Sequence, residues 1–90
     1  MLQTISITIK GKVQGVFFRQ STKNIANQSA IKGEVKNLSN GNVQIIATGT
    51  KEQLDKLIEW CKKGPPRAEV TGVDVQEVSL QLFHHFKITG

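Results

Sequence analysis

The sequence contains one cysteine, five aromatic residues and no long apolar run within its 90 residues. Cys61 alone cannot form a disulfide within the chain, which is typical of a reducing compartment, so we expect a cytoplasmic protein. The N-terminal stretch MLQTISITIK alternates apolar and polar residues and therefore indicates a strand, not a signal peptide. Membrane helices need roughly 20 apolar residues, so no membrane partner is expected. We predict a single domain spanning residues 1–90.

Acidic residues are absent from the first third of the chain, since none precedes Glu34. This segment carries five basic side chains: Lys10, Lys12, Arg19, Lys23 and Lys32. The rest of the chain carries seven basic and seven acidic side chains, which cancel, so the whole net charge of +5 lies in residues 1–33. Such a segment is either an ordinary solvated surface or a field that attracts an anionic ligand, nucleic acid included.

Hydrophobic periodicity predicts two helices and up to five strands. The expected strands cover residues 3–10, 31–38, 42–49, 70–78 and 83–88, and the expected helices cover residues 18–30 and the segment between Thr50 and Gly64. Trp60 lies off the apolar stripe of the second helix, so we interpret it as a boundary packing residue. The order βαββαβ predicts an α+β, ferredoxin-like two-layer sandwich. Its sheet is mostly antiparallel, with two helices on one face.

The two central strands form a hairpin around SNG, and two registers are possible. A two-residue turn would pair Leu38 with Val43, whereas a three-residue loop pairs Asn37 with Val43. The second register collects the valines and isoleucines on one face and gives Gly41 the left-handed position, so it is preferred. In this register Asn37 is a polar residue at the end of an otherwise apolar strand face.

The stretch GKVQGVFFR, residues 11–19, has the composition of an anion-binding loop. It follows the first strand and leads into the first helix, where backbone N–H groups and a helix N-terminus can bind phosphate. Neither the GxxxxGK[ST] pattern nor GxGxxG is present, so nucleotide binding of those types is not expected. The residues alone leave an alternative, in which Gly15 makes a turn and Arg19 is a solvated helix-start residue.

GKVQGVFFR resembles the acylphosphatase signature GxVQGVxFR. The resemblance continues along nearly the whole chain, through GEVKN at 33–37, NG at 40–41 and GPPRAEV at 64–70. It implies a ferredoxin-like fold and a hydrolase that cleaves the carboxyl–phosphate anhydride of a small acyl phosphate. Inorganic phosphate would then be a product and an expected inhibitor.

The resemblance also implies roles for individual residues. Arg19 and Asn37 correspond to the catalytic pair, with Arg19 binding phosphate and Asn37 holding the attacking water. The backbone amides of Gln14, Gly15, Val16, Phe17, Phe18 and Arg19 correspond to the phosphate cradle. Neither a cofactor nor a metal is expected, because no histidine and carboxylate cluster has ligand spacing. His84 and His85 are adjacent in the expected last strand, would point to opposite faces and are interpreted as non-catalytic.

Two positions depart from the family pattern, and other functions remain open. Glu34 replaces a usual aromatic residue, but by strand parity it faces away from Asn37. Ala30 replaces a frequent glycine, which would shift the end of the first helix slightly. The alternatives are a regulatory domain without activity and an anion- or RNA-binding module. Because the central strands contain no aromatic residue, RNA binding is disfavoured. A monomer without a nucleic-acid partner is expected.

Overall fold

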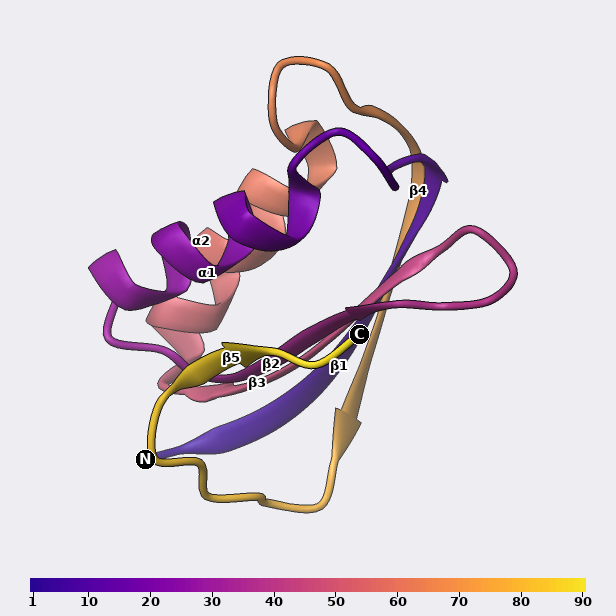
Figure 1. Cartoon of the computed structure of the whole chain (residues 1–90). Helices are drawn as coiled ribbons and strands as arrows, with labels where there is room; N and C mark the ends of the chain where they lie inside the picture. The colour runs from indigo at the N-terminus through magenta and orange to yellow at the C-terminus, as the bar shows by residue number, and fades with distance from the viewer.

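Two helices cover one face of a five-stranded sheet in the computed structural model, which describes all 90 residues (Figure 1). The elements are β1 (Gln3–Lys12), α1 (Phe18–Gln28), β2 (Lys32–Asn37), β3 (Val43–Gly49), α2 (Lys51–Lys63), β4 (Glu69–Val78) and β5 (Phe86–Ile88). The strand order is β4-β1-β3-β2-β5. All neighbouring strands are antiparallel except β2 and β5. The predicted α+β, ferredoxin-like sandwich is therefore confirmed.

The strand directions bring three chain segments to one edge of the sheet. Strands β1 and β2 are both antiparallel to β3, so they run in the same direction, and β5 is parallel to β2. The C-terminal ends of these three strands consequently lie at the same edge. The loop after β1 and the last residue of β2 meet there.

The core lies between the sheet and the helices. Ile5, Ile7 and Ile9 point toward the helices and are at most 4% exposed. Alternate residues of a strand face opposite sides, so this single stripe supplies the core contribution of β1. The rings of Phe18 and Trp60 join α1 to α2, with centroids 5.3 Å apart and planes tilted by 59°. Trp60 is thus a packing residue, as predicted.

The hairpin between β2 and β3 has the predicted three-residue loop. Asn37 pairs with Val43, and the Leu38 N–H donates to the Asn42 carbonyl at 2.8 Å. Gly41 adopts a φ of 94°, a conformation that glycine accommodates without steric cost. The observed register is the predicted one. Asn37 therefore occupies the predicted position at the end of β2, and Glu34 lies on the opposite face.

Two strands differ from their expected bounds by two residues or more. Strand β1 continues through a bulge to Lys12, so Gly11 belongs to the strand and not to the loop. A Cβ at Gly11 would lie 2.1 Å from the Glu69 carbonyl oxygen, so this glycine permits the close approach of β4, not of a ligand. Strand β5 begins only at Phe86, so the expectation that His84 and His85 lie in a strand was wrong. Both histidines are exposed in the preceding segment.

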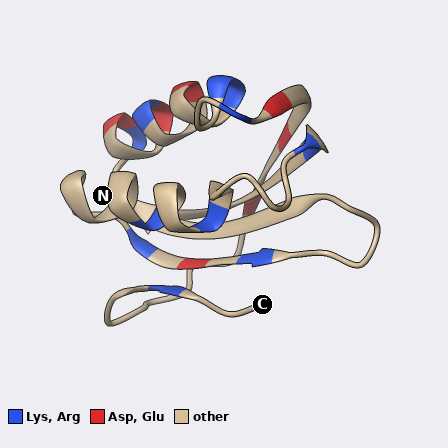
Figure 2. Cartoon of the chain, turned by 45° about the horizontal axis from the view of Figure 1, so that its top comes forward, with Lys and Arg blue, Asp and Glu red and all other residues tan.

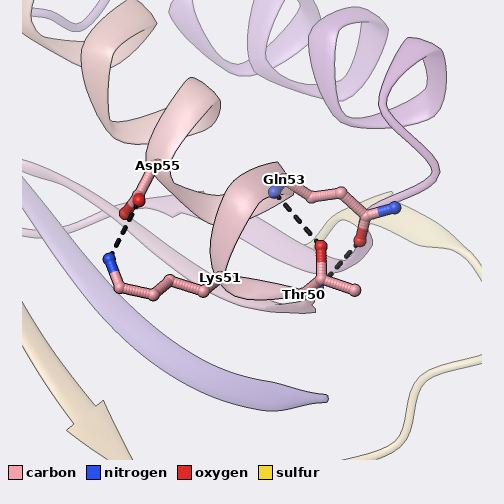
Figure 3. Close-up of polar contacts among 4 residues, drawn as sticks. All are labelled: Thr50, Lys51, Gln53 and Asp55. Atoms are coloured by element: carbon pink, nitrogen blue, oxygen red, sulfur yellow. Dashed lines mark hydrogen bonds and ion pairs between the residues drawn. The ribbon is translucent and has the colours of Figure 1, made fainter. Parts of the chain in front are cut away.

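A capping box begins α2, as predicted (Figure 3). The Thr50 side chain accepts a hydrogen bond from the Gln53 N–H at 3.2 Å, and the Gln53 side chain accepts one from the Thr50 N–H at 2.9 Å. An ion pair between Lys51 and Asp55, at 3.0 Å, lies one turn along the same helix. The two hydrogen bonds satisfy donors that a helix start otherwise leaves unpaired, which fixes where α2 begins.

Helix α1 ends at Gln28, two residues before the expected end at residue 30. Ala30 has a left-handed φ of 57°, and the Ile31 N–H donates back to the Ala26 carbonyl at 2.9 Å. This geometry is a Schellman motif, whose left-handed position usually holds glycine. The departure at Ala30 therefore leaves the motif in place and adds backbone strain.

Replacing Ala30 by glycine is expected to raise the free energy of unfolding by about 0.5–1 kcal/mol, because glycine adopts positive φ without the Cβ clash. Urea unfolding followed by circular dichroism measures the change. Ala26, inside the same helix, provides the control, since Ala26→Gly should destabilise by about 1–2 kcal/mol through lost helix propensity and the loss of a buried methyl group. A loss of stability in Ala30→Gly would contradict the strain at this position.

Candidate active site

A cavity of about 380 Å³ opens at the edge where β1, β2 and β5 end. Its lining consists of Val13, Gly15, Phe17, Phe18, Arg19, Gln20, Asn37 and Ile88. Arg19 and Asn37, which are 18 positions apart in the chain, thus border the same cavity. Gln14 and Val16, predicted as part of the cradle, are not among its lining residues.

The loop between β1 and α1 presents unpaired backbone donors. Every backbone N–H from Gln14 through Gln20 lacks an acceptor within the protein. Gly15 and Phe17 have φ values of 73° and 64°, which lie in the left-handed region. Residues in this region that alternate with right-handed ones turn successive N–H groups into a concave anion-binding site, called a nest. The first turn of α1 also has no side-chain cap, so its positive end remains available. The unpaired amide of Gln20 extends this run beyond the predicted segment.

The side chain of Gln14 fastens the loop to the hairpin. Its Nε2 donates to the carbonyl oxygen of Leu38 at 2.8 Å and to that of Asn42 at 2.9 Å. These two bonds hold the start of the loop against the segment that follows Asn37. Sequence reasoning assigned only the Gln14 backbone and missed this contact, because no local pattern reveals a partner 24 residues away.

Arg19 lies in the first turn of α1 and forms no ion pair with an aspartate or glutamate. Its Nη1 donates to the backbone oxygen of Gly90, which also accepts from the Asn37 N–H at 3.2 Å. The remaining guanidinium donors have no partner in the protein. A guanidinium carries five N–H donors in a rigid fork, so one contact orients it and the others stay free for an anion.

The Asn37 side-chain amide makes no hydrogen bond, and its Oδ1 is buried. Leaving a buried acceptor unpaired costs about 1–3 kcal/mol of folding free energy, so the unpaired Oδ1 of Asn37 requires a structural or functional explanation. The residue borders the cavity that also contains Arg19. An amide can both accept and donate, which suits a side chain that holds a water molecule.

The charge around the cavity is positive. Acidic residues occur on α2, β2 and β4, but none occurs on α1 (Figure 2). Lys10 is paired with Asp74 at 3.0 Å, whereas Arg19 has no acidic partner. The surroundings of the unpaired loop amides therefore favour an anionic ligand.

Other reactive side chains do not contribute to this cavity. Burial raises the pKa of the Cys61 thiol to about 12, so it is protonated at neutral pH and cannot serve as a thiolate nucleophile. His84 borders a different cavity of about 600 Å³, near the start of β2 and far along the strand from Asn37. No three His, Cys, Asp or Glu side chains are grouped so that they could hold a metal ion.

None of the helices combines the length and apolar character needed to cross a membrane.

The acylphosphatase family model matches residues 5–88. An acylphosphatase of Acaryochloris marina is 50% identical over 84 residues, which cover 93% of this chain and 90% of that protein.

Two solved structures agree with both the sequence and the fold. The structure of an acylphosphatase from Coxiella burnetii superposes with a TM-score of 0.95 at 39% identity, covering 98% of this chain and 93% of that one. The acylphosphatase from Bacillus subtilis gives a TM-score of 0.94 at 37% identity, with full coverage of both chains. The chain therefore belongs to the acylphosphatase family and is a hydrolase that acts on acyl phosphates.

Proposed function

We propose that the phosphoryl group of the substrate binds to the backbone amides of residues 14–19 and to Arg19, and that Asn37 positions the attacking water. The buried, unpaired Oδ1 of Asn37 is the observation that carries this proposal. It belongs to a residue that borders the same cavity as Arg19, next to the run of unpaired loop amides. A water held by Asn37 would supply the missing hydrogen bond and would be ready for attack.

The site as proposed contains no carboxylate side chain, and the substrate explains why none is needed. The leaving group of an acyl phosphate is a carboxylate whose conjugate acid has a pKa of about 4, so it departs without protonation. The protein must then neutralise charge on the phosphoryl oxygens and align a water with the P–O bond. Arg19 and the loop amides perform the first task, and Asn37 performs the second.

The reaction balances without a protein base. Water oxygen forms a bond to phosphorus as the bond to the carboxylate oxygen breaks, and the carboxylate leaves with the bonding electrons. The proton from water moves to a phosphoryl oxygen of the substrate. The Asn37 side chain is a neutral amide and not a base, so it orients the water and does not remove the proton.

Hydrolysis of benzoyl phosphate by the purified protein, with EDTA present, tests this reaction. We expect turnover at the same rate with and without the chelator, because neither Arg19 nor Asn37 acts through a metal ion. Loss of the benzoyl phosphate absorbance follows the reaction directly. Turnover that disappears with EDTA and returns with a divalent cation would contradict the metal-independent mechanism.

We also propose that residues 1–90 act as one domain and as a monomer in the cytoplasm. One sheet and one buried core of 16 residues extend over the chain, and a single chain supplies every residue of the proposed site. The central strands β1 and β3 carry no aromatic side chain, which argues against RNA as a partner. Small acyl phosphates are the substrates, and inorganic phosphate is a product that should also inhibit.

A further inference from the structure

The side chain of Phe17 is unusually exposed for an aromatic residue. It is 72% exposed, while its neighbours Val16 and Phe18 are 7% and 2% exposed. Its φ of 64° lies in the left-handed region, which bulky residues rarely adopt. The ring is not buried, so its packing does not offset the strain of the backbone. Backbone strain of this kind tends to occur where a ligand binds.

Phe17 borders the cavity of the proposed site, together with a second exposed apolar residue. Ile88, the last residue of β5, is 38% exposed and also lines this cavity. The other two apolar lining residues, Val13 and Phe18, are at most 2% exposed and belong to the core. Phe17 and Ile88 are therefore the apolar side chains that a ligand in the cavity could still cover.

An acyl phosphate has two parts with opposite chemical character. The phosphoryl end binds to the backbone amides and Arg19, so the acyl end must extend toward other lining residues. No acidic side chain lines the cavity, and its only cationic side chain, Arg19, is engaged by the phosphoryl group. An apolar acyl group gains free energy roughly in proportion to the apolar surface that it covers, so a bulky apolar group gains more than a small or charged one.

We propose that Phe17 and Ile88 form an acyl-group subsite that favours aromatic and bulky apolar acyl phosphates over small ones such as acetyl phosphate. This inference rests on the proposed function, which places the phosphoryl group at the loop amides. Phe17 contacts the acyl group face to face or edge to face, and Ile88 contacts it from the end of β5. An aromatic contact of this type corresponds to about a 2- to 12-fold preference.

The ratio of kcat/KM for benzoyl phosphate to that for acetyl phosphate tests the subsite. Both substrates transfer the same phosphoryl group, so damage to the amide cradle lowers both rates and cancels in the ratio. Phe17→Asn removes the ring with a residue that tolerates positive φ, and we expect it to lower the ratio about fivefold to tenfold. Phe17→Trp should keep the wild-type ratio, and Ile88→Thr should lower it about twofold to threefold.

Binding of two unreactive phosphonates separates this inference from the mechanism. Benzoylmethylphosphonate and acetonylphosphonate carry a carbon bridge that water cannot cleave, and calorimetry gives their affinities. The affinity ratio should fall in Phe17→Asn as the kinetic ratio does. If wild type turns over neither substrate, the proposed mechanism fails, yet the phosphonate ratio still decides the subsite. An affinity ratio unchanged in both Phe17→Asn and Ile88→Thr overturns the inference.

Discussion

Arg19→Gln is expected to lower kcat/KM for benzoyl phosphate about a thousandfold, the scale found when a group that stabilises transition-state charge is removed. Glutamine keeps most of the side-chain length but loses the charge and the paired N–H fork. The fold should be retained, because Arg19 contacts no acidic side chain and makes one hydrogen bond, to Gly90. Steady-state kinetics measures the loss, and circular dichroism verifies the fold.

Competitive inhibition by inorganic phosphate provides the second measurement on Arg19. If Arg19 binds the phosphoryl group, phosphate should inhibit the residual activity of Arg19→Gln far more weakly than it inhibits wild type. Lys23, one turn along α1, is a matched control, since Lys23→Gln removes the same charge from the same helix outside the cavity lining. If phosphate inhibition weakens as much in Lys23→Gln as in Arg19→Gln, phosphate binding depends on the overall positive potential of the helix and not on the guanidinium group of Arg19.

Asn37→Ala is expected to lower kcat about a hundredfold or more while changing KM little. The residue aligns water in the transition state and makes no proposed contact with the bound phosphoryl group. The free energy of unfolding should be unchanged or up to about 1 kcal/mol higher, because the substitution removes a buried acceptor that has no partner. Kinetics and urea unfolding of the same preparations measure the two quantities together.

Asn40, in the hairpin loop three residues later, is the control for Asn37. Its Oδ1 accepts a hydrogen bond from the Asn42 N–H at 3.1 Å, and it does not line the cavity. Asn40→Ala should therefore lower stability slightly and leave kcat near the wild-type value. Wild-type kcat in Asn37→Ala, or a loss of kcat explained by unfolding, would remove Asn37 from the proposed mechanism.

The sequence predicts those parts of this fold that local chemistry determines. The capping box specifies the start of α2, and the apolar face of the hairpin specifies the pairing of Asn37 with Val43. That register alone places Asn37 at the end of a strand. The family signature then connects Asn37 to Arg19, a link that hydrophobic periodicity does not provide.

The sequence does not predict contacts between distant segments. The bulge that carries Gly11 into β1 depends on the close approach of β4, and the bonds of Gln14 depend on the position of the hairpin. The left-handed conformation of Phe17 is also not apparent from the sequence, because backbone propensities favour glycine, asparagine or aspartate at such a position. These features arise from tertiary packing, which local patterns do not encode.

The parallel pairing of β5 with β2 has a consequence for how the enzyme folds. It brings Ile88 and Gly90 to residues that precede them by about half the chain or more, so the cavity is complete only after the most distant segments have joined. Closing such long loops is entropically costly and belongs to the slow steps of folding. Recovery of activity during refolding therefore reports on the complete native topology, whereas helix formation can precede it.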